Sequence, residues 1–91
     1  MIVPLLNLLL VEPDSADAAA IRAMLADVPR PAFHIDAVTS CADALVRLGR
    51  GGVDVVLLDL MLPDGRGLMV FEQIRRAAPE ALILVLSASA D

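Results

Sequence analysis

The chain contains Val53-Asp54-Val55-Val56-Leu57-Leu58-Asp59-Leu60-Met61-Leu62-Pro63-Asp64-Gly65, an almost unbroken apolar run that ends in a carboxylate and leads into a Pro-Asp-Gly turn. A run that is apolar on both faces predicts a central strand of a parallel sheet covered by helices on both sides. In such sheets, reaction sites lie just beyond the carboxyl ends of the strands. Asp59 lies at such an end and is therefore a candidate functional residue. The alternative is that Asp59 only begins the turn.

Two further apolar runs also end in polar residues. The first runs to Val11 and leads into Glu12-Pro13-Asp14, and the second, residues 81–86, leads into Ser87. From hydrophobic periodicity we predict strands at about 5–11, 33–38, 53–58 and 82–86, alternating with helices at about 15–28, 41–48 and 67–78. Short loops and right-handed crossovers make a parallel α/β sheet the expected result.

Local signals refine this outline. Ser40-x-x-Asp43 resembles a capping box at the start of the second helix. The glycine-rich residues 49–52 follow a helix and precede a strand, which predicts a helix C-cap and turn and not a phosphate cradle. The second strand begins by alternating apolar and polar residues, as expected at a sheet edge, with His34 on the wet side. The expected core positions of the first and third helices are Ile21, Met24, Leu25 and Val28, and Leu68, Phe71 and Ile74.

Composition excludes several classes of protein. The 91 residues fit one domain, and a net charge of -5 with seven arginines and no lysine argues against nucleic-acid contact by this segment. No apolar stretch approaches the ~20 residues of a membrane span. The N-terminus lacks the pattern of a signal peptide, and Cys41 has no partner for an internal disulfide. We therefore expect a cytoplasmic protein with no membrane contact.

In these features the chain resembles the receiver domain of two-component response regulators, a flavodoxin-like module that is phosphorylated on an aspartate. The resemblance covers essentially all 91 residues and is strongest from Val53 to Ile74. It implies a parallel sheet of order 2-1-3-4 with helices on both faces. The implied function is to accept a phosphoryl group on Asp59 from a histidine kinase or phosphotransfer protein in a phosphorelay. Beyond its own magnesium-dependent phosphoryl transfer, the domain is not expected to be an enzyme.

The resemblance also implies roles for other residues. Glu12 matches the first of two acids after the first strand, and Met61 matches the residue whose main-chain carbonyl binds the metal. Ser87 matches the hydroxyl residue that turns toward the phosphoryl group, and Ala88 matches the small residue after it. Carboxylates that meet at the ends of adjacent strands need a cation, and Mg²⁺ suits hard oxygen ligands.

The chain departs from the family pattern in two ways. Pro13 occupies the place of the second acid, so we expect weak magnesium binding. Asp14, one residue later, is a candidate substitute ligand, although it also fits a helix N-cap. The family's lysine and its fourth helix, fifth strand and fifth helix have no counterpart in residues 1–91. The fourth strand is then an uncovered edge, from which we expect association into a homodimer, strand exchange between chains, or partial unfolding of this 91-residue segment.

Two alternative functions remain at this stage. Pro13 is consistent with a degenerate receiver that acts as a protein-interaction module without phosphorylation. A phosphohydrolase of the haloacid-dehalogenase type also uses an aspartate at a strand end. That family needs a second aspartate two residues later, where this chain has Met61, so the sequence disfavours it.

Overall fold

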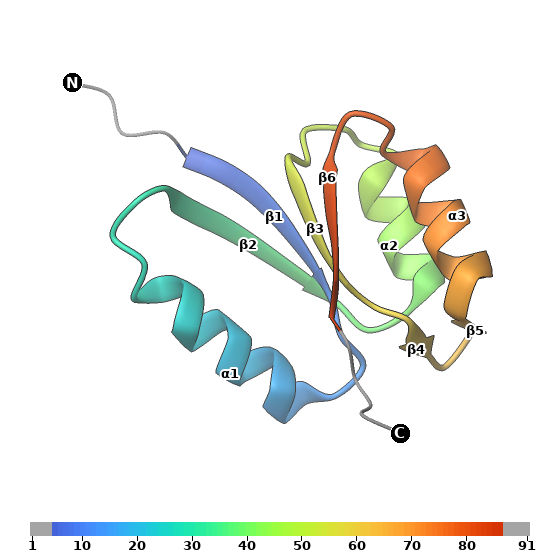
Figure 1. Cartoon of the computed structure of the whole chain (residues 1–91), viewed down its shortest axis with the longest axis horizontal. Coiled ribbons are helices and arrows are strands. Elements are labelled where there is room, and N and C mark those ends of the chain that lie inside the picture. The colour runs from blue at the N-terminus through green and yellow to red at the C-terminus, as the bar shows by residue number, and fades with distance from the viewer. Residues whose placement is uncertain (1–4, 87–91) are drawn as a thin grey trace.

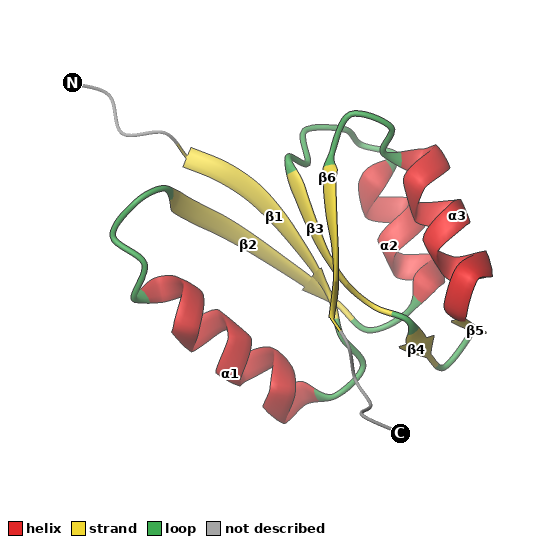
Figure 2. Ribbon diagram, viewed as in Figure 1, coloured by secondary structure: helices red, strands yellow, loops and turns green. Residues whose placement is uncertain are grey.

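A computed structural model describes residues 5–86 as one parallel sheet with helices on both faces (Figures 1 and 2). The strand order is β2-β1-β3-β6, and the three pairings are all parallel. Helix α1 lies on one face of the sheet and helices α2 and α3 lie on the other. The predicted order 2-1-3-4 is confirmed, with β6 as the fourth strand. The elements are β1 (Leu5–Val11), α1 (Ser15–Ala26), β2 (Ala32–Val38), α2 (Cys41–Leu48), β3 (Val55–Asp59), β4 (Met61–Leu62), β5 (Gly65–Arg66), α3 (Gly67–Ala77) and β6 (Leu82–Leu86).

The core lies on both faces of the two central strands, which is why β1 and β3 are apolar in consecutive positions. Leu9 and Val11 of β1 pack with α2 and α3, whereas Leu8 and Leu10 pack toward α1. All four side chains are buried. Full burial of one such side chain contributes roughly 1.5–3 kcal/mol. The strand ends that carry Glu12 and Asp59 are therefore held by the best-buried part of the molecule.

Helix α1 is shorter than predicted and packs through a narrower face. It ends at Ala26, because Val28 precedes Pro29 and a residue before proline is disfavoured in the helical conformation. Its contacts with the sheet come from Ala18, Ile21 and Leu25. The prediction that Met24 is buried is wrong, since this side chain is 69% exposed, and Val28 is also exposed.

Helix α3 buries a face that only partly matches the predicted one. Val70 and Ile74 are fully buried and Phe71 is half-buried, whereas Leu68 is 73% exposed. Leu68 precedes Val70 by two residues, which places the two side chains on nearly opposite sides of a helix. The burial predicted for Leu68 is therefore wrong, and Val70 takes its place in the core.

Residues 61–66, predicted to be a loop, form a short antiparallel hairpin of β4 and β5 directly after Asp59. Met61 pairs with Arg66 and Leu62 with Gly65. Glycine at position 65 leaves room for α3, because a Cβ there would lie 2.9 Å from Cγ2 of Val70 and one of the two would have to shift. Gly67, with a φ of 65°, then turns the chain into α3.

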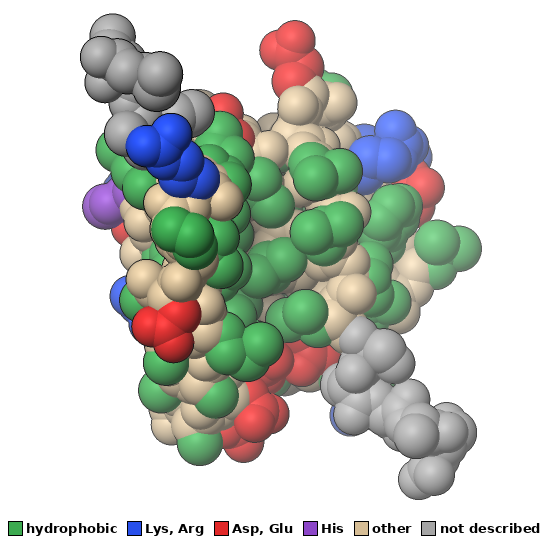
Figure 3. Space-filling model, turned by 60° about the vertical axis from the view of Figure 1, so that its left-hand side comes forward, with side chains coloured by type: hydrophobic (Ala, Val, Ile, Leu, Met, Phe, Trp, Pro, Cys, Tyr) green, Lys and Arg blue, Asp and Glu red, His purple; other side chains and the backbone are tan. Residues whose placement is uncertain are grey.

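The face of the sheet that carries α1 is only partly covered within residues 5–86. Helix α1 packs beside β2 and β1, and no described helix covers β6 on this face. Leu82 and Leu84 of β6 are 58% and 47% exposed. Figure 3 shows hydrophobic side chains gathered across this side of the molecule. None of the helices in the described part of the chain is both long and apolar enough to cross a bilayer.

Candidate functional site

The carboxyl ends of β1 and β3 bring Glu12 and Asp59 to the same edge of the sheet. The register pairs Val11 with Leu58, so the residues that follow, Glu12 and Asp59, are neighbours across the two strands. Each is only 6% exposed, and they are the two buried charged residues found among residues 5–86. The main-chain N–H of Glu12 donates to the carbonyl of Val38 at 3.0 Å, which extends the β1–β2 ladder up to the site.

The electrostatics of this pair favour a cation. Burial raises the pKa of Glu12, and the negative charge of Asp59 raises it further, while a hydrogen bond from the main chain of Asp14 opposes the change. Two buried carboxylates at one strand edge repel each other, and a divalent cation between them would remove this cost. Mg²⁺ is commonly held by one or two carboxylates with water completing its shell, so the residues present fit this ion.

Asp59 is oriented by the chain that follows it. Its Oδ1 accepts a hydrogen bond from the main-chain N–H of Met61 at 2.8 Å. This contact places the start of the β4–β5 hairpin against the carboxylate. It also leaves the second oxygen, Oδ2, outside that hydrogen bond. The main chain of Met61, predicted to supply a carbonyl ligand, is thus next to Asp59.

Asp14 has the alternative role that the sequence left open. Its Oδ1 accepts from the main-chain N–H of Asp17 at 2.9 Å, and it is the N-cap of α1. Its own N–H donates to Oε2 of Glu12 at 3.2 Å, so it orients Glu12 through the main chain. Within residues 5–86 no third acidic, histidine or cysteine side chain joins a metal-binding cluster. Ser87 and Ala88 lie outside the described residues.

Asp64, expected to be only a turn residue, has a structural role that the sequence analysis missed. Its Oδ1 accepts from the main-chain N–H of Cys41 at 2.8 Å, and its Oδ2 accepts from that of Ala42 at 2.9 Å. Ser40 Oγ accepts from the main-chain N–H of Asp43 at 3.1 Å, which makes Ser40 the N-cap of α2 and is one of the two hydrogen bonds of the predicted capping box. The β4–β5 turn therefore caps α2, and the two N–H donors hold the pKa of Asp64 below its ordinary value.

We expect Asp64→Asn to lower the melting temperature at neutral pH, because an amide presents one acceptor oxygen instead of two and no negative charge at the start of α2. The stabilisation that ionised Asp64 gives the folded wild-type protein should be complete above about pH 4, the ordinary pKa of aspartate. It should disappear as the pH falls through the lower pKa that Asp64 has in the folded state. Thermal melts from pH 7 to acid would test this, with Glu80→Gln as an exposed control. A difference in melting temperature between wild type and Asp64→Asn that widens in acid would contradict the role of ionised Asp64 as a cap of α2.

The thiol of Cys41 is hydrogen-bonded to a residue of α3 and not to Glu12 or Asp59. Cys41 is buried, and its Sγ donates to Oε1 of Gln73 at 3.3 Å. Burial raises the pKa of the thiol, with a further contribution from the charge of Asp64. His34 is exposed, as predicted, and lies 3.4 Å from Asp36 at the sheet edge, remote from Asp59 in the strand order.

A paired acid at the ends of β1 and β3, followed by a hairpin into α3, matches a known family. The sequence fits the response regulator receiver domain over residues 8–91. The chain belongs to this family. It is 39% identical over 83 residues to the transcriptional regulatory protein DltR of Streptococcus agalactiae serotype III (strain NEM316), which covers 91% of this chain and 36% of DltR. The receiver therefore spans about a third of the length of that relative.

Solved structures agree with the receiver fold. The MaeR response regulator bound to beryllium trifluoride has a TM-score of 0.82 and 27% identity, over 94% of this chain and 70% of MaeR. The receiver domain of the sensor histidine kinase PA1611 from Pseudomonas aeruginosa PAO1, which has a magnesium ion in its active site cleft, has a TM-score of 0.81 and 26% identity. That alignment covers 96% of this chain and 70% of the solved PA1611 receiver domain. The flavodoxin-like fold implied by the resemblance is confirmed.

Proposed function

We propose that this receiver accepts a phosphoryl group on Asp59 from a histidine kinase or phosphotransfer protein. The observation that supports the proposal is the burial of Asp59 beside Glu12 at adjacent strand ends. A carboxylate can attack phosphorus directly. In the step proposed, an oxygen of Asp59 forms a P–O bond while the P–N bond of the donor phosphohistidine breaks, and the imidazole leaves with the bonding pair and takes up a proton.

The described residues would contribute mainly by positioning. The N–H of Met61 holds Oδ1 of Asp59, which leaves Oδ2 as the candidate nucleophile. Glu12, Asp59 and the main-chain carbonyl of Met61 would hold Mg²⁺. When bound, the ion would neutralise the two carboxylates and the incoming phosphoryl oxygens. Ser87, the next residue after β6, would contact the phosphoryl group through its hydroxyl, and Ala88 would leave room beside it.

The test uses the full-length protein with beryllium fluoride and Mg²⁺, a combination that mimics an acyl phosphate. We expect a higher melting temperature and shifted amide resonances near Asp59 in wild type, with neither change in Asp59→Asn. Asp64→Asn is the matched control, since it removes a nearby carboxylate outside the pair and should still respond. A wild-type protein that shows neither change would contradict the proposal and would support a degenerate receiver that is not phosphorylated, the alternative suggested by Pro13. The burial of Glu12 and Asp59 side by side disfavours that alternative.

Magnesium affinity is a second point of the proposal, because Pro13 supplies no carboxylate and Asp14 is engaged as a cap. We expect Pro13→Asp to tighten magnesium binding by about tenfold, equivalent to about 1.4 kcal/mol. Pro13→Asn is the matched control, because it removes the proline ring without adding a charge. Isothermal titration of the full-length variants with MgCl₂ would measure the difference. Equal affinities for Pro13→Asp and wild type would show that this position does not limit binding.

A further inference from the structure

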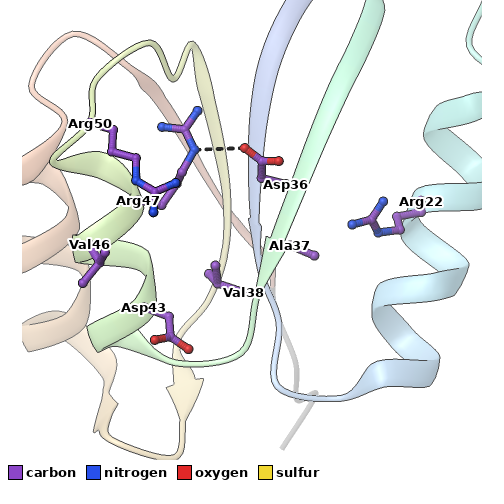
Figure 4. Close-up of a pocket in the computed structure, with 8 residues that line it drawn as sticks. All are labelled: Arg22, Asp36, Ala37, Val38, Asp43, Val46, Arg47 and Arg50. Carbon is purple, nitrogen blue, oxygen red and sulfur yellow. Dashed lines mark hydrogen bonds and ion pairs between the residues drawn. The ribbon is translucent and has the colours of Figure 1, made fainter.

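A groove of about 470 Å³ crosses the outer edge of β2, on the opposite side of the sheet order from β6 (Figure 4). Arg22 reaches into it from α1, and Arg47 and Arg50 border it from the α2 side. The floor is β2 itself. The lining residues are Arg22, Asp36, Ala37, Val38, Asp43, Val46, Arg47 and Arg50.

The main chain along this groove is open to a further strand. The carbonyl of Val38 accepts from Glu12, so the main-chain groups of Val38 face β1. Successive residues of a strand point these groups to opposite sides, which turns those of Ala37 and Ile35 away from β1. No strand lies beyond β2 among residues 5–86. The outer edge of β2 therefore presents main-chain donors and acceptors of Ile35 and Ala37 that pair with no other strand among residues 5–86.

The charge in the groove is opposite to that of the whole chain. Its lining has three arginines and two aspartates, whereas the chain carries -5. Arg47 is already used, since its Nε donates to Asp36 at 2.9 Å and its Nη1 donates to the carbonyl of Gly51 at 2.9 Å. Arg22 and Arg50 are exposed, and neither makes an ion pair within the described residues. Two available cations thus flank the open strand edge, one on each face of the sheet. Of the two lining carboxylates, Asp36 is paired with Arg47, so Asp43 is the one whose negative charge would oppose a bound anion.

We propose that the β2 edge binds an extended acidic peptide segment of a partner protein, which adds a strand to the sheet. Main-chain pairing with Ile35 and Ala37 would supply the affinity, as in other cases of strand addition. Because adjacent side chains of a strand point to opposite faces, two consecutive acidic residues would reach Arg22 on one face and Arg50 on the other. The matching ligand is therefore an extended segment with paired acidic residues.

The test is a titration of the full-length protein into the labelled peptide Thr-Val-Glu-Glu-Val-Glu-Glu-Val-Thr at low ionic strength, followed by fluorescence anisotropy. The glutamine version of the peptide is the ligand control. We expect the double variant Arg22→Gln, Arg50→Gln to weaken binding by about tenfold. The matched control Arg75→Gln, Arg76→Gln removes the same charge from α3 and should weaken it by less than about threefold.

Amide resonances locate the binding site independently of affinity. We expect the peptide to shift Ile35 and Ala37 and to protect their N–H groups from exchange, with little change at β6. The proposal is overturned if the peptide does not bind, if both double variants weaken binding equally, or if the shifts lie elsewhere. It is also overturned if the protein forms dimers through β2 that exclude the peptide, since a second copy would then be the occupant.

Discussion

Asp59→Asn is expected to abolish phosphorylation of the full-length protein. In wild type, incubation with a small phosphodonor such as acetyl phosphate and Mg²⁺ should add the mass of one phosphoryl group, read by intact mass spectrometry. Asparagine nearly preserves the shape of the side chain and its acceptor for the N–H of Met61, but its amide is a poor nucleophile. We therefore expect labelling at background level and little change in fold.

The matched control for this experiment is Asp64→Asn, five residues away. Asp64 binds the main chain at the start of α2 and is exposed, so its variant should still be labelled. Circular dichroism would show that both variants are folded. Labelling that persists in Asp59→Asn would move the acceptor to another acid, with Glu12 the first to examine.

The polypeptide of these 91 residues alone is expected to associate into dimers through β6. The strand is an edge of the described sheet, and Leu82, Leu84 and Val85 are each more than 40% exposed. An apolar edge strand is a template for pairing with another chain. Covering each such leucine would contribute roughly 1.5–3 kcal/mol, which is large beside a typical domain stability of about 5–15 kcal/mol.

Sizing chromatography with light scattering measures this association. Leu84→Lys places a charge on the exposed edge and should shift the polypeptide to monomer. Met69→Lys, at a side chain of α3 that is 75% exposed, is the matched control and should leave the dimer intact. A well-folded, two-state monomer of the wild-type polypeptide would show that the open face of the sheet does not drive association.

Local chemistry made much of the fold predictable from sequence. The apolar runs of β1 and β6 match the structure at both ends, and the start of α2 follows from the Ser40 capping box. The order of the sheet followed from the resemblance, and alternating strands and helices required it to be parallel. Asp59 could be singled out as a candidate because it follows a strongly apolar run at the carboxyl end of a predicted parallel strand, where reaction sites lie.

Long-range packing decided the rest. Asp64 caps α2 from 22 and 23 residues away, and no local pattern marks such a contact. Met24 and Leu68 have the periodicity of core residues but are exposed, because other residues of each helix contact the sheet: Ile21 and Leu25 in α1, and Val70 and Ile74 in α3. Glu12 and Asp59 are neighbours because of the β1–β3 register. The groove at the outer edge of β2 exists because α1 and α2 flank that strand. Local periodicity was enough to outline the three helices, the four strands of the parallel sheet and the acids that follow two of them, but not the β4–β5 hairpin, which was expected to be a loop. Which side chains meet depends on strand register and on the packing of elements distant in the chain, so it became known from the fold alone.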